Sequence, residues 1–283
     1  RTPLGPMKML RGTSRRNGSM GCEIPKATMP SFTLSDGATL AYGDSGGDDW
    51  TIVLIHGWQA DRRVWEDVIA ALGSGVRVIA VDLRGSGASS EAGGPYTLER
   101  YAQDTRELID GLEIAPAVVA GHSMGATVAL RLAVDAPQSV RAMVLVAPVP
   151  ASGGGYSPKG EAYLRSTAGD PAKVQAWLAR TFAAEPDEAT LAPLCAAAAL
   201  TARDTALESF ESWAHADFAE ETRTIRTPVV VAAPEKDAPE SVDERVAALL
   251  PNARFVVLPG CAHYAILERP GAIAELIREV CRQ

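Results

Sequence analysis

The sequence predicts an α/β protein with a mostly parallel sheet of eight strands, helices on both faces and a helical cap insertion. Apolar runs of strand length alternate with segments of helical spacing from about residue 31, which is typical of strands joined by crossover helices. The central runs are apolar at nearly every position, as expected of strands buried on both faces. The alternation stops near Pro148 and resumes near Thr227, and the Ala-rich stretch between them has helical character.

The predicted elements follow one another in a regular order. Two short strands with a turn at Asp36-Gly37 are predicted within 31–46, and six more within 50–57, 76–87, 115–123, 140–148, 227–237 and 253–260. Amphipathic spacing predicts helices within 61–75, 97–112, 125–137, 241–251 and 270–283, with Thr97 as the N-cap of the second. The insertion would stand over the carboxyl ends of the strands, where such sheets place their sites.

We expect three parts in the chain. Residues 29–148 and 223–283 form the core, and residues 149–222 form a helical cap or lid. Residues 1–28 form a flexible N-terminal extension, because they carry six Lys or Arg and one Glu and have no apolar periodicity. Their Arg- and Ser-rich composition leaves an organelle transit peptide as an alternative, whereas the missing apolar stretch argues against a secretory signal.

Composition limits the partners of the protein. The formal net charge of −8 argues against a nucleic-acid surface, and no apolar run approaches the ~18 residues of a membrane helix. We therefore expect a cytoplasmic protein whose partner is a small-molecule substrate, with its oligomeric state left open. No metal or cofactor is expected. The cysteines show no metal spacing and are expected to be reduced: Cys22, Cys195, Cys261 and Cys281.

The stretch VVAGHSMGATVAL, residues 118–130, sets a serine where a strand turns into a helix. Gly121 and Gly125 flank Ser123 in G-x-S-x-G spacing, because the sharp turn strains its central residue and bulky neighbours would clash. The turn lifts the hydroxyl clear of the sheet edge. The N–H of Met124, at the helix start, would point to a forming oxyanion. The alternative is an ordinary Gly-rich turn with an N-cap serine.

A serine nucleophile needs a base, and the chain has four histidines. His263 follows the last strand and therefore lies in a loop at the carboxyl ends of the strands, so it is the predicted base. His56 ends a buried strand, His122 is expected to project away from Ser123, and His215 lies in the helical insertion as a solvated or packing residue.

The base needs an acid that orients it. Asp237 follows the strand that begins near Thr227 and is the predicted acid, with Glu235 as the alternative. The order Ser, Asp, His along the chain fits the hydrolase arrangement on a sheet of this topology.

Four motifs together resemble the α/β-hydrolase superfamily, in its serine esterase and haloperoxidase-like branch, over about residues 30–283. They are HGW at 56–58, DLRGSGASS at 82–90, GHSMGA at 121–126 and GCAHYAILERP at 260–270. The resemblance implies that the Trp58 N–H is the second oxyanion donor and that its indole lines the pocket. It also implies a structural turn at Asp82, Arg84, Gly85 and Gly87. Ala262 and Ala233 stand where the family often has Gly, and both are small enough to leave the triad intact.

The predicted reaction is hydrolysis of a carboxylic ester, thioester or lactone with an apolar or aromatic group. Ser123 attacks the carbonyl, His263 takes and returns the proton, and Asp237 holds the imidazole tautomer. The N–H groups of Met124 and Trp58 hold the oxyanion, and water releases the acid from the acyl-enzyme. The candidate pocket residues are aromatic: Trp58, Trp177, Trp213 and Tyr264.

Four alternatives share this fold. They are a cofactor-free oxygenase or haloperoxidase-like enzyme, a C–C bond hydrolase, an aminopeptidase of the proline-iminopeptidase type, and a binding protein that kept the fold. Scarce asparagine, only Asn17 and Asn252, disfavours the C–C hydrolase. An aminopeptidase would need carboxylates in the insertion for the substrate amine. The candidates fit a solvated helix face better: Glu208, Glu211, Glu220 and Glu221.

Overall fold

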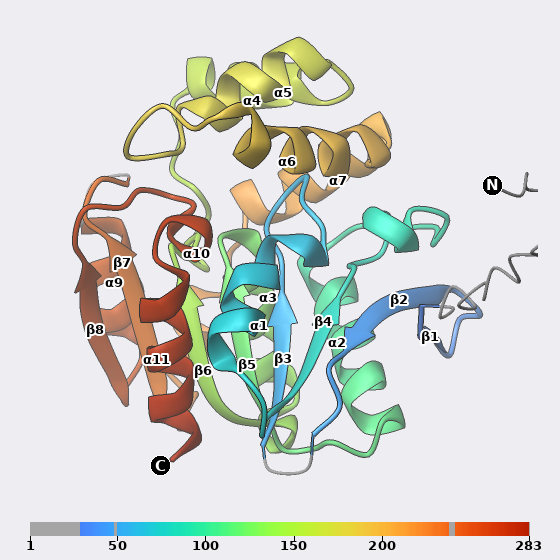
Figure 1. The fold of residues 1–283 in the computed structure, drawn as a ribbon, viewed down its shortest axis with the longest axis vertical. Helices are drawn as coiled ribbons and strands as arrows, with labels where there is room; N and C mark the ends of the chain where they lie inside the picture. Colours follow the sequence, from blue (N-terminus) through green and yellow to red (C-terminus); the bar gives the residue numbers. More distant parts are fainter. Residues whose placement is uncertain (1–28, 48–49, 238–240, 283) are drawn as a thin grey trace, which may run out of the picture.

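Eight strands form one sheet in the order β1-β2-β4-β3-β5-β6-β7-β8 (Figure 1). The computed structural model describes residues 29–47, 50–237 and 241–282, so the extension 1–28 and Cys22 lie outside the described residues. The strands are β1 (Ser31–Thr33), β2 (Thr39–Asp44), β3 (Thr51–Ile55), β4 (Arg77–Val81), β5 (Ala117–His122), β6 (Val140–Val146), β7 (Val229–Pro234) and β8 (Ala253–Leu258). β1 and β2 pair antiparallel and every later pair is parallel, apart from β2 with β4, so the predicted fold class is confirmed.

Helices cover both faces of the sheet because successive strand residues are buried on opposite sides. Val53 and Val119 belong to one core, against α2 (Leu98–Gly111), α3 (Met124–Asp135) and α9 (Ser241–Leu249). Ile52 and Val118 belong to the other core, against α1 (Glu66–Leu72) and α11 (Pro270–Cys281). The continuous apolar runs of the central strands follow from this double burial. Thr97 caps α2 as predicted, since its hydroxyl accepts the N–H of Arg100 at 3.3 Å.

Helices replace the β/α alternation between β6 and β7. They are α4 (Pro158–Thr167), α5 (Pro171–Ala179), α6 (Glu188–Leu200), α7 (Arg203–Ala214) and the short α8 (Ala219–Thr222). We call α4–α7 the cap helices, because they lie above the carboxyl ends of the parallel strands (Figure 1). None of the helices in the described part of the chain is both long and apolar enough to cross a membrane.

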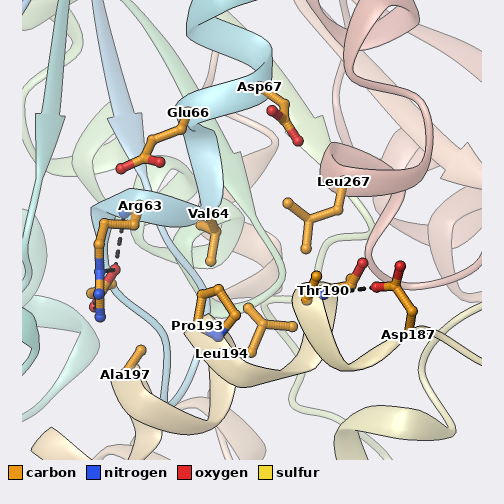
Figure 2. Close-up of a pocket in the computed structure, with 12 residues that line it drawn as sticks. Arg63, Val64, Glu66, Asp67, Asp187, Thr190, Pro193, Leu194, Ala197 and Leu267 are labelled. Atoms are coloured by element: carbon orange, nitrogen blue, oxygen red, sulfur yellow. Dashed lines mark hydrogen bonds and ion pairs between the residues drawn. The ribbon is translucent and has the colours of Figure 1, made fainter.

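Cap helix α6 faces the core across a cavity of about 430 Å³ (Figure 2). Pro193 and Leu194 of α6 lie opposite Val64 of the 3₁₀ turn η1 (Arg62–Trp65) and Leu267 of α10 (Ala265–Glu268). The cap therefore meets the core on this side through a space that side chains do not fill.

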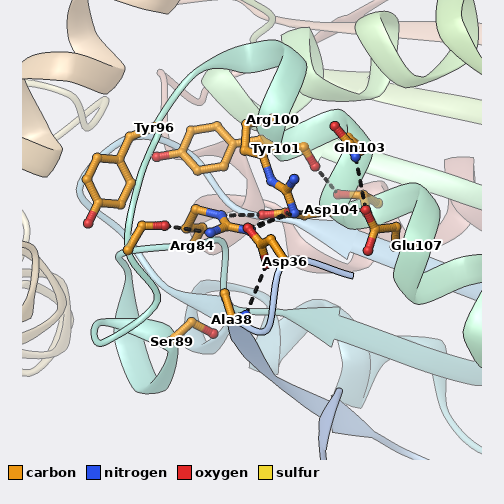
Figure 3. Close-up of polar contacts among 12 residues, drawn as sticks. Asp36, Ala38, Arg84, Ser89, Tyr96, Arg100, Tyr101, Gln103, Asp104 and Glu107 are labelled. Carbon is orange, nitrogen blue, oxygen red and sulfur yellow. Dashed lines mark hydrogen bonds and ion pairs between the residues drawn. The ribbon is translucent and has the colours of Figure 1, made fainter. Parts of the chain in front are cut away.

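A buried ion-pair cluster holds the β1–β2 hairpin to α2 (Figure 3). Arg84 is 1% exposed, and two of its nitrogens lie 2.8 and 2.9 Å from the carboxylate of Asp104 in α2. The same guanidinium lies 2.8 Å from Asp36 in the predicted hairpin turn. A buried guanidinium has to be paired, so Arg84 stabilises the scaffold rather than the site. A Cβ on Gly87 (φ +51°) would come within 2.7 Å of the Asp82 carboxylate, which explains glycine in this turn.

The turn from β5 to α3 brings helix and sheet unusually close. A Cβ on Gly125 would lie 2.4 Å from the carbonyl oxygens of both Ile55 and His56, at the end of β3. A Cβ on Gly121 would lie 2.3 Å from the carbonyl oxygen of Gly125. Backbone atoms cannot move aside as a flexible side chain can, so both positions require glycine.

Gly125→Ala should therefore destabilise the protein by about 1–3 kcal/mol or more, because the added methyl group has no space. Gly93→Ala is the matched control, since a Cβ there meets nothing within 4 Å. Urea unfolding of both variants measures the difference. Equal stability of the two variants would contradict the close approach.

Candidate active site

Ser123 sits at the sharp turn between β5 and α3. Its backbone has φ 54° and ψ −122°, a conformation that a residue with a side chain rarely adopts. Its N–H donates to the carbonyl oxygen of Val146 at 2.9 Å, which ties the turn to the end of β6. Ser123 lines a cavity of about 210 Å³ together with His263 and Asp237. The structure thus brings the three predicted catalytic side chains to the wall of one cavity.

His263 and Asp237 meet because they follow β8 and β7, two adjacent parallel strands. The Nδ1 of His263 lies 2.7 Å from Oδ2 of Asp237, a hydrogen-bonding distance. With Nδ1–H donating to the carboxylate, Nε2 keeps a lone pair that can accept a proton. Glu235, the alternative acid, instead accepts the N–H of Gly260 at 2.7 Å.

The electrostatics of the pair favour a basic imidazole. Burial alone would lower the pKa of His263, but the charge of Asp237 and its hydrogen bond prevail and leave the pKa above its ordinary value. Asp243, in the first turn of α9, is a second carboxyl group that the sequence analysis did not single out. Burial, and then the charge of Asp237, raise the pKa of Asp243 to about 7.

The two residues predicted to donate an N–H to an oxyanion lie in main chain close to Ser123. Met124 is the first residue of α3, so its N–H has no acceptor within the helix. A Cβ on Gly57 would lie 3.2 Å from Cβ of Ser123, so the main chain that leads into Trp58 runs directly against the serine. Both predicted donors are thus main-chain neighbours of Ser123.

The cavity wall is largely aromatic. All four predicted pocket residues line it, and they come from both the core and the cap: Trp58, Trp177, Trp213 and Tyr264. The Trp58 ring centroid lies 5.4 Å from that of Trp177 in α5 and 5.7 Å from that of Trp213 in α7. Its indole N–H donates to the carbonyl oxygen of Ala206 at 2.9 Å. The cap helices therefore hold the Trp58 side chain in place.

His122 lies beside the predicted base, which the sequence analysis did not foresee. It is among the residues that line the same cavity, and its ring centroid lies 5.0 Å from that of His263. Burial, and then the proximity of His263, lower the pKa of His122 to about 3, so the ring is neutral. Its Nε2 lies 2.8 Å from the carbonyl oxygen of His263 and donates to it. His215 lies outside the cavity, about half exposed, beside Glu211.

Glu268 links the histidine loop to the cap, which the sequence analysis did not foresee. One carboxylate oxygen accepts the N–H of Ala262, the residue before His263, at 2.8 Å. The other accepts the N–H of Ala183, in the chain that follows α5, at 2.9 Å. The rings of Phe182 and Tyr264 stack beside this link at 5.2 Å. One carboxylate therefore ties the chain before His263 to the chain that follows α5.

Among residues 29–47, 50–237 and 241–282, no three His, Cys, Asp or Glu side chains lie together so as to hold a metal ion. Cys195, Cys261 and Cys281 are free thiols. The larger cavity under α6 is lined by neither Ser123 nor His263 (Figure 2).

Comparison with known proteins points in one direction. The model described as "Alpha/beta hydrolase family" matches residues 52–276. The Mycobacterium tuberculosis protein named "Putative non-heme bromoperoxidase BpoC" is 32% identical over 262 residues, which cover 83% of this chain and 94% of that protein. The enol-lactonase from Burkholderia xenovorans LB400 superposes with a TM-score of 0.81 at 28% identity, covering 90% of this chain and 100% of its own. A hydrolase from Pseudomonas aeruginosa PA01 gives 0.79 at 29% identity, covering 90% and 98%.

The charge of Asp237 should be what keeps the pKa of His263 high. In Asp237→Asn burial still lowers the pKa of His263 and only the charge of Asp243 opposes it, so we expect the pKa of His263 to fall. Glu235→Gln is the matched control, because it removes a nearby carboxylate that accepts the N–H of Gly260 and does not contact His263. It should leave the pKa of His263 nearly unchanged. NMR titration of the imidazole measures both variants. If the pKa of His263 fell in Glu235→Gln and stayed unchanged in Asp237→Asn, Glu235 would be the partner of His263.

Proposed function

The chain belongs to the alpha/beta hydrolase family, and from that premise we propose that it hydrolyses carboxylic esters, thioesters or lactones through an acyl-enzyme on Ser123. The observation that carries the proposal is the 2.7 Å contact between His263 Nδ1 and Asp237 Oδ2 at the wall of the cavity that Ser123 lines. A nucleophile, a base and an orienting acid around one cavity are the requirements of this chemistry.

The proposed mechanism assigns one task to each group. His263 Nε2 removes the proton of the Ser123 hydroxyl as its oxygen attacks the substrate carbonyl carbon. The N–H groups of Met124 and Trp58 stabilise the negative charge on the carbonyl oxygen, aided by the helix dipole of α3. His263 then protonates the leaving oxygen or sulfur. Asp237 stabilises the imidazolium, and water repeats the sequence to release the acid.

We also propose that residues 149–222 act as a cap that selects the substrate, over a core formed by 29–148 and 223–283. The proposal is supported by the aromatic wall that α5 and α7 contribute beside Trp58. Such a wall favours an apolar or aromatic group by burying its surface. The likeness to the enol-lactonase at 28% identity is consistent with a lactone as one form of the substrate.

A haloperoxidase-like activity is the second candidate, because the relative that is 32% identical carries a bromoperoxidase name. Bromination of an indicator dye in hydrogen peroxide and bromide would measure it. Hydrolysis of an ester in the absence of peroxide would support the first candidate. Dye bromination with no ester hydrolysis would favour the second.

Ser123→Ala should lower turnover of a 4-nitrophenyl ester by roughly 10⁴-fold, because it removes the nucleophile. Full activity of Ser123→Ala, with its fold intact by circular dichroism, would refute the acyl-enzyme.

In the wild type, kcat/KM should fall on the acid side through a pKa above ~6.5, since protonated His263 cannot accept the serine proton. A pH–rate profile measures this fall.

Glu268→Gln should lower kcat by about tenfold. Both oxygens of the Glu268 carboxylate accept a backbone N–H, and the substitution replaces one of them with an amide NH₂ group, which is a donor. One backbone N–H would then face a donor in place of an acceptor. We expect KM to change little and the acid limb to stay in place, since Asp237 still faces His263. Glu235→Gln is the control, because it also loses a carboxylate that accepts a backbone N–H in this region. Equal losses in kcat for the two variants would reduce Glu268 to a general stabilising role.

A further inference from the structure

One cationic side chain lines the cavity of Ser123. Of the described residues that form its wall, Arg180 is the single Lys or Arg. It directly follows α5, one turn beyond Trp177, and it is exposed. A charged group that lines a cavity and also reaches solvent lies at the opening of that cavity. The rest of the wall is mostly aromatic or apolar, apart from the candidate catalytic groups.

Most other cations of this region are paired with a carboxylate. Arg165, Lys173, Arg203 and Arg223 each lie within 4 Å of one, at 2.6, 3.2, 3.8 and 2.9 Å respectively. Lys159 of α4 has no such pair in the described part of the chain, but it does not line the cavity. Within the part of the chain that the structure describes, Arg180 forms no such ion pair, and its guanidinium lies 5.7 Å from the ring centroid of Tyr163. Arg180 is thus a cavity-lining residue whose charge no carboxylate of the described residues neutralises by a direct ion pair.

The main chain around Arg180 is tied to the histidine loop. Its N–H donates to the carbonyl oxygen of Trp177 at 3.0 Å, and the carbonyl oxygen of Thr181 accepts the N–H of Tyr264 at 3.4 Å. The contact between Ala183 and Glu268 continues this attachment. The base of the Arg180 side chain therefore keeps a fixed position relative to His263, as a group that aligns a substrate must.

We propose that the natural substrate is an anionic ester or lactone whose carboxylate binds Arg180 while its apolar body packs against Trp58, Trp177 and Trp213. This inference rests on the proposed function. A guanidinium presents a planar fork of donors that matches a carboxylate, and such charge-assisted bonds are the stronger ones. The chain carries a net charge of −8, so its overall field does not attract anions and the recognition has to be local.

The test uses 4-nitrophenyl monoesters of dicarboxylic acids of four to eight carbons, each beside its neutral methyl ester. Each pair differs mainly in the charge. A second pair, the acetate esters of 4-hydroxybenzoate and of its methyl ester, sets the carboxylate on the leaving group instead. The wild type should prefer the anionic member of at least one pair by about tenfold in kcat/KM, chiefly through KM. Added salt should weaken this preference, because Arg180 is exposed.

Arg180→Gln should abolish the preference for the anionic member of each pair, and Arg180→Lys should retain part of it. Arg203→Gln removes the same charge from a cap helix outside the cavity wall and should change nothing. Equal hydrolysis of both members of every pair, or equal effects of Arg180→Gln and Arg203→Gln, would overturn the inference and leave the proposed function standing. No hydrolysis of any ester, charged or neutral, would instead overturn the proposed function, and the inference with it.

Discussion

The close approach of α3 to the end of β3 is the constraint on which the site depends. Without side chains at 121 and 125, the helix starts against the carbonyl oxygens of Ile55 and His56. The chain can enter the helix at this distance only through a sharp turn, and Ser123 takes the positive φ that the turn imposes. The same turn leaves the first N–H groups of α3 without helical acceptors. The strained backbone of Ser123, its place at the cavity wall and the candidate oxyanion donor thus have one cause.

The other residues of the site lie in loops that follow adjacent strands. Hydrogen bonds to the cap fix the position of the His263 loop. Parallel pairing of β7 with β8 carries Asp237 and His263 to the same edge, where a short hydrogen bond joins them. Glu268 then connects the His263 loop with the chain after α5. In our account the cap therefore does two things: it supplies the aromatic wall and it supports the main chain that carries the base.

The sequence predicted the features that local patterns encode. Apolar runs that alternate with segments of helical spacing predicted eight strands, and the continuous runs predicted the double burial of the central strands. The spacing of glycines around Ser123 predicted the turn. Contacts between distant segments left no such pattern. The contact of His122 with the His263 loop was not foreseen, because the partner of a side chain at a strand end depends on the loop that packs over it. Asp243, Glu268 and Arg180 escaped notice because a carboxylate or guanidinium in an ordinary helix pattern shows its role only when its partners in space are known.

If Ser123 is the nucleophile of this cavity, a reagent that reacts with activated serines should form a covalent bond with it. The protein is incubated with a serine-reactive fluorophosphonate, digested, and its peptides are weighed by mass spectrometry. We expect one adduct per chain, on the peptide that contains Ser123. Labelling of His263→Ala should be much slower, because the base is missing. An adduct on another residue, or no adduct in a folded protein that still hydrolyses esters, would contradict this expectation.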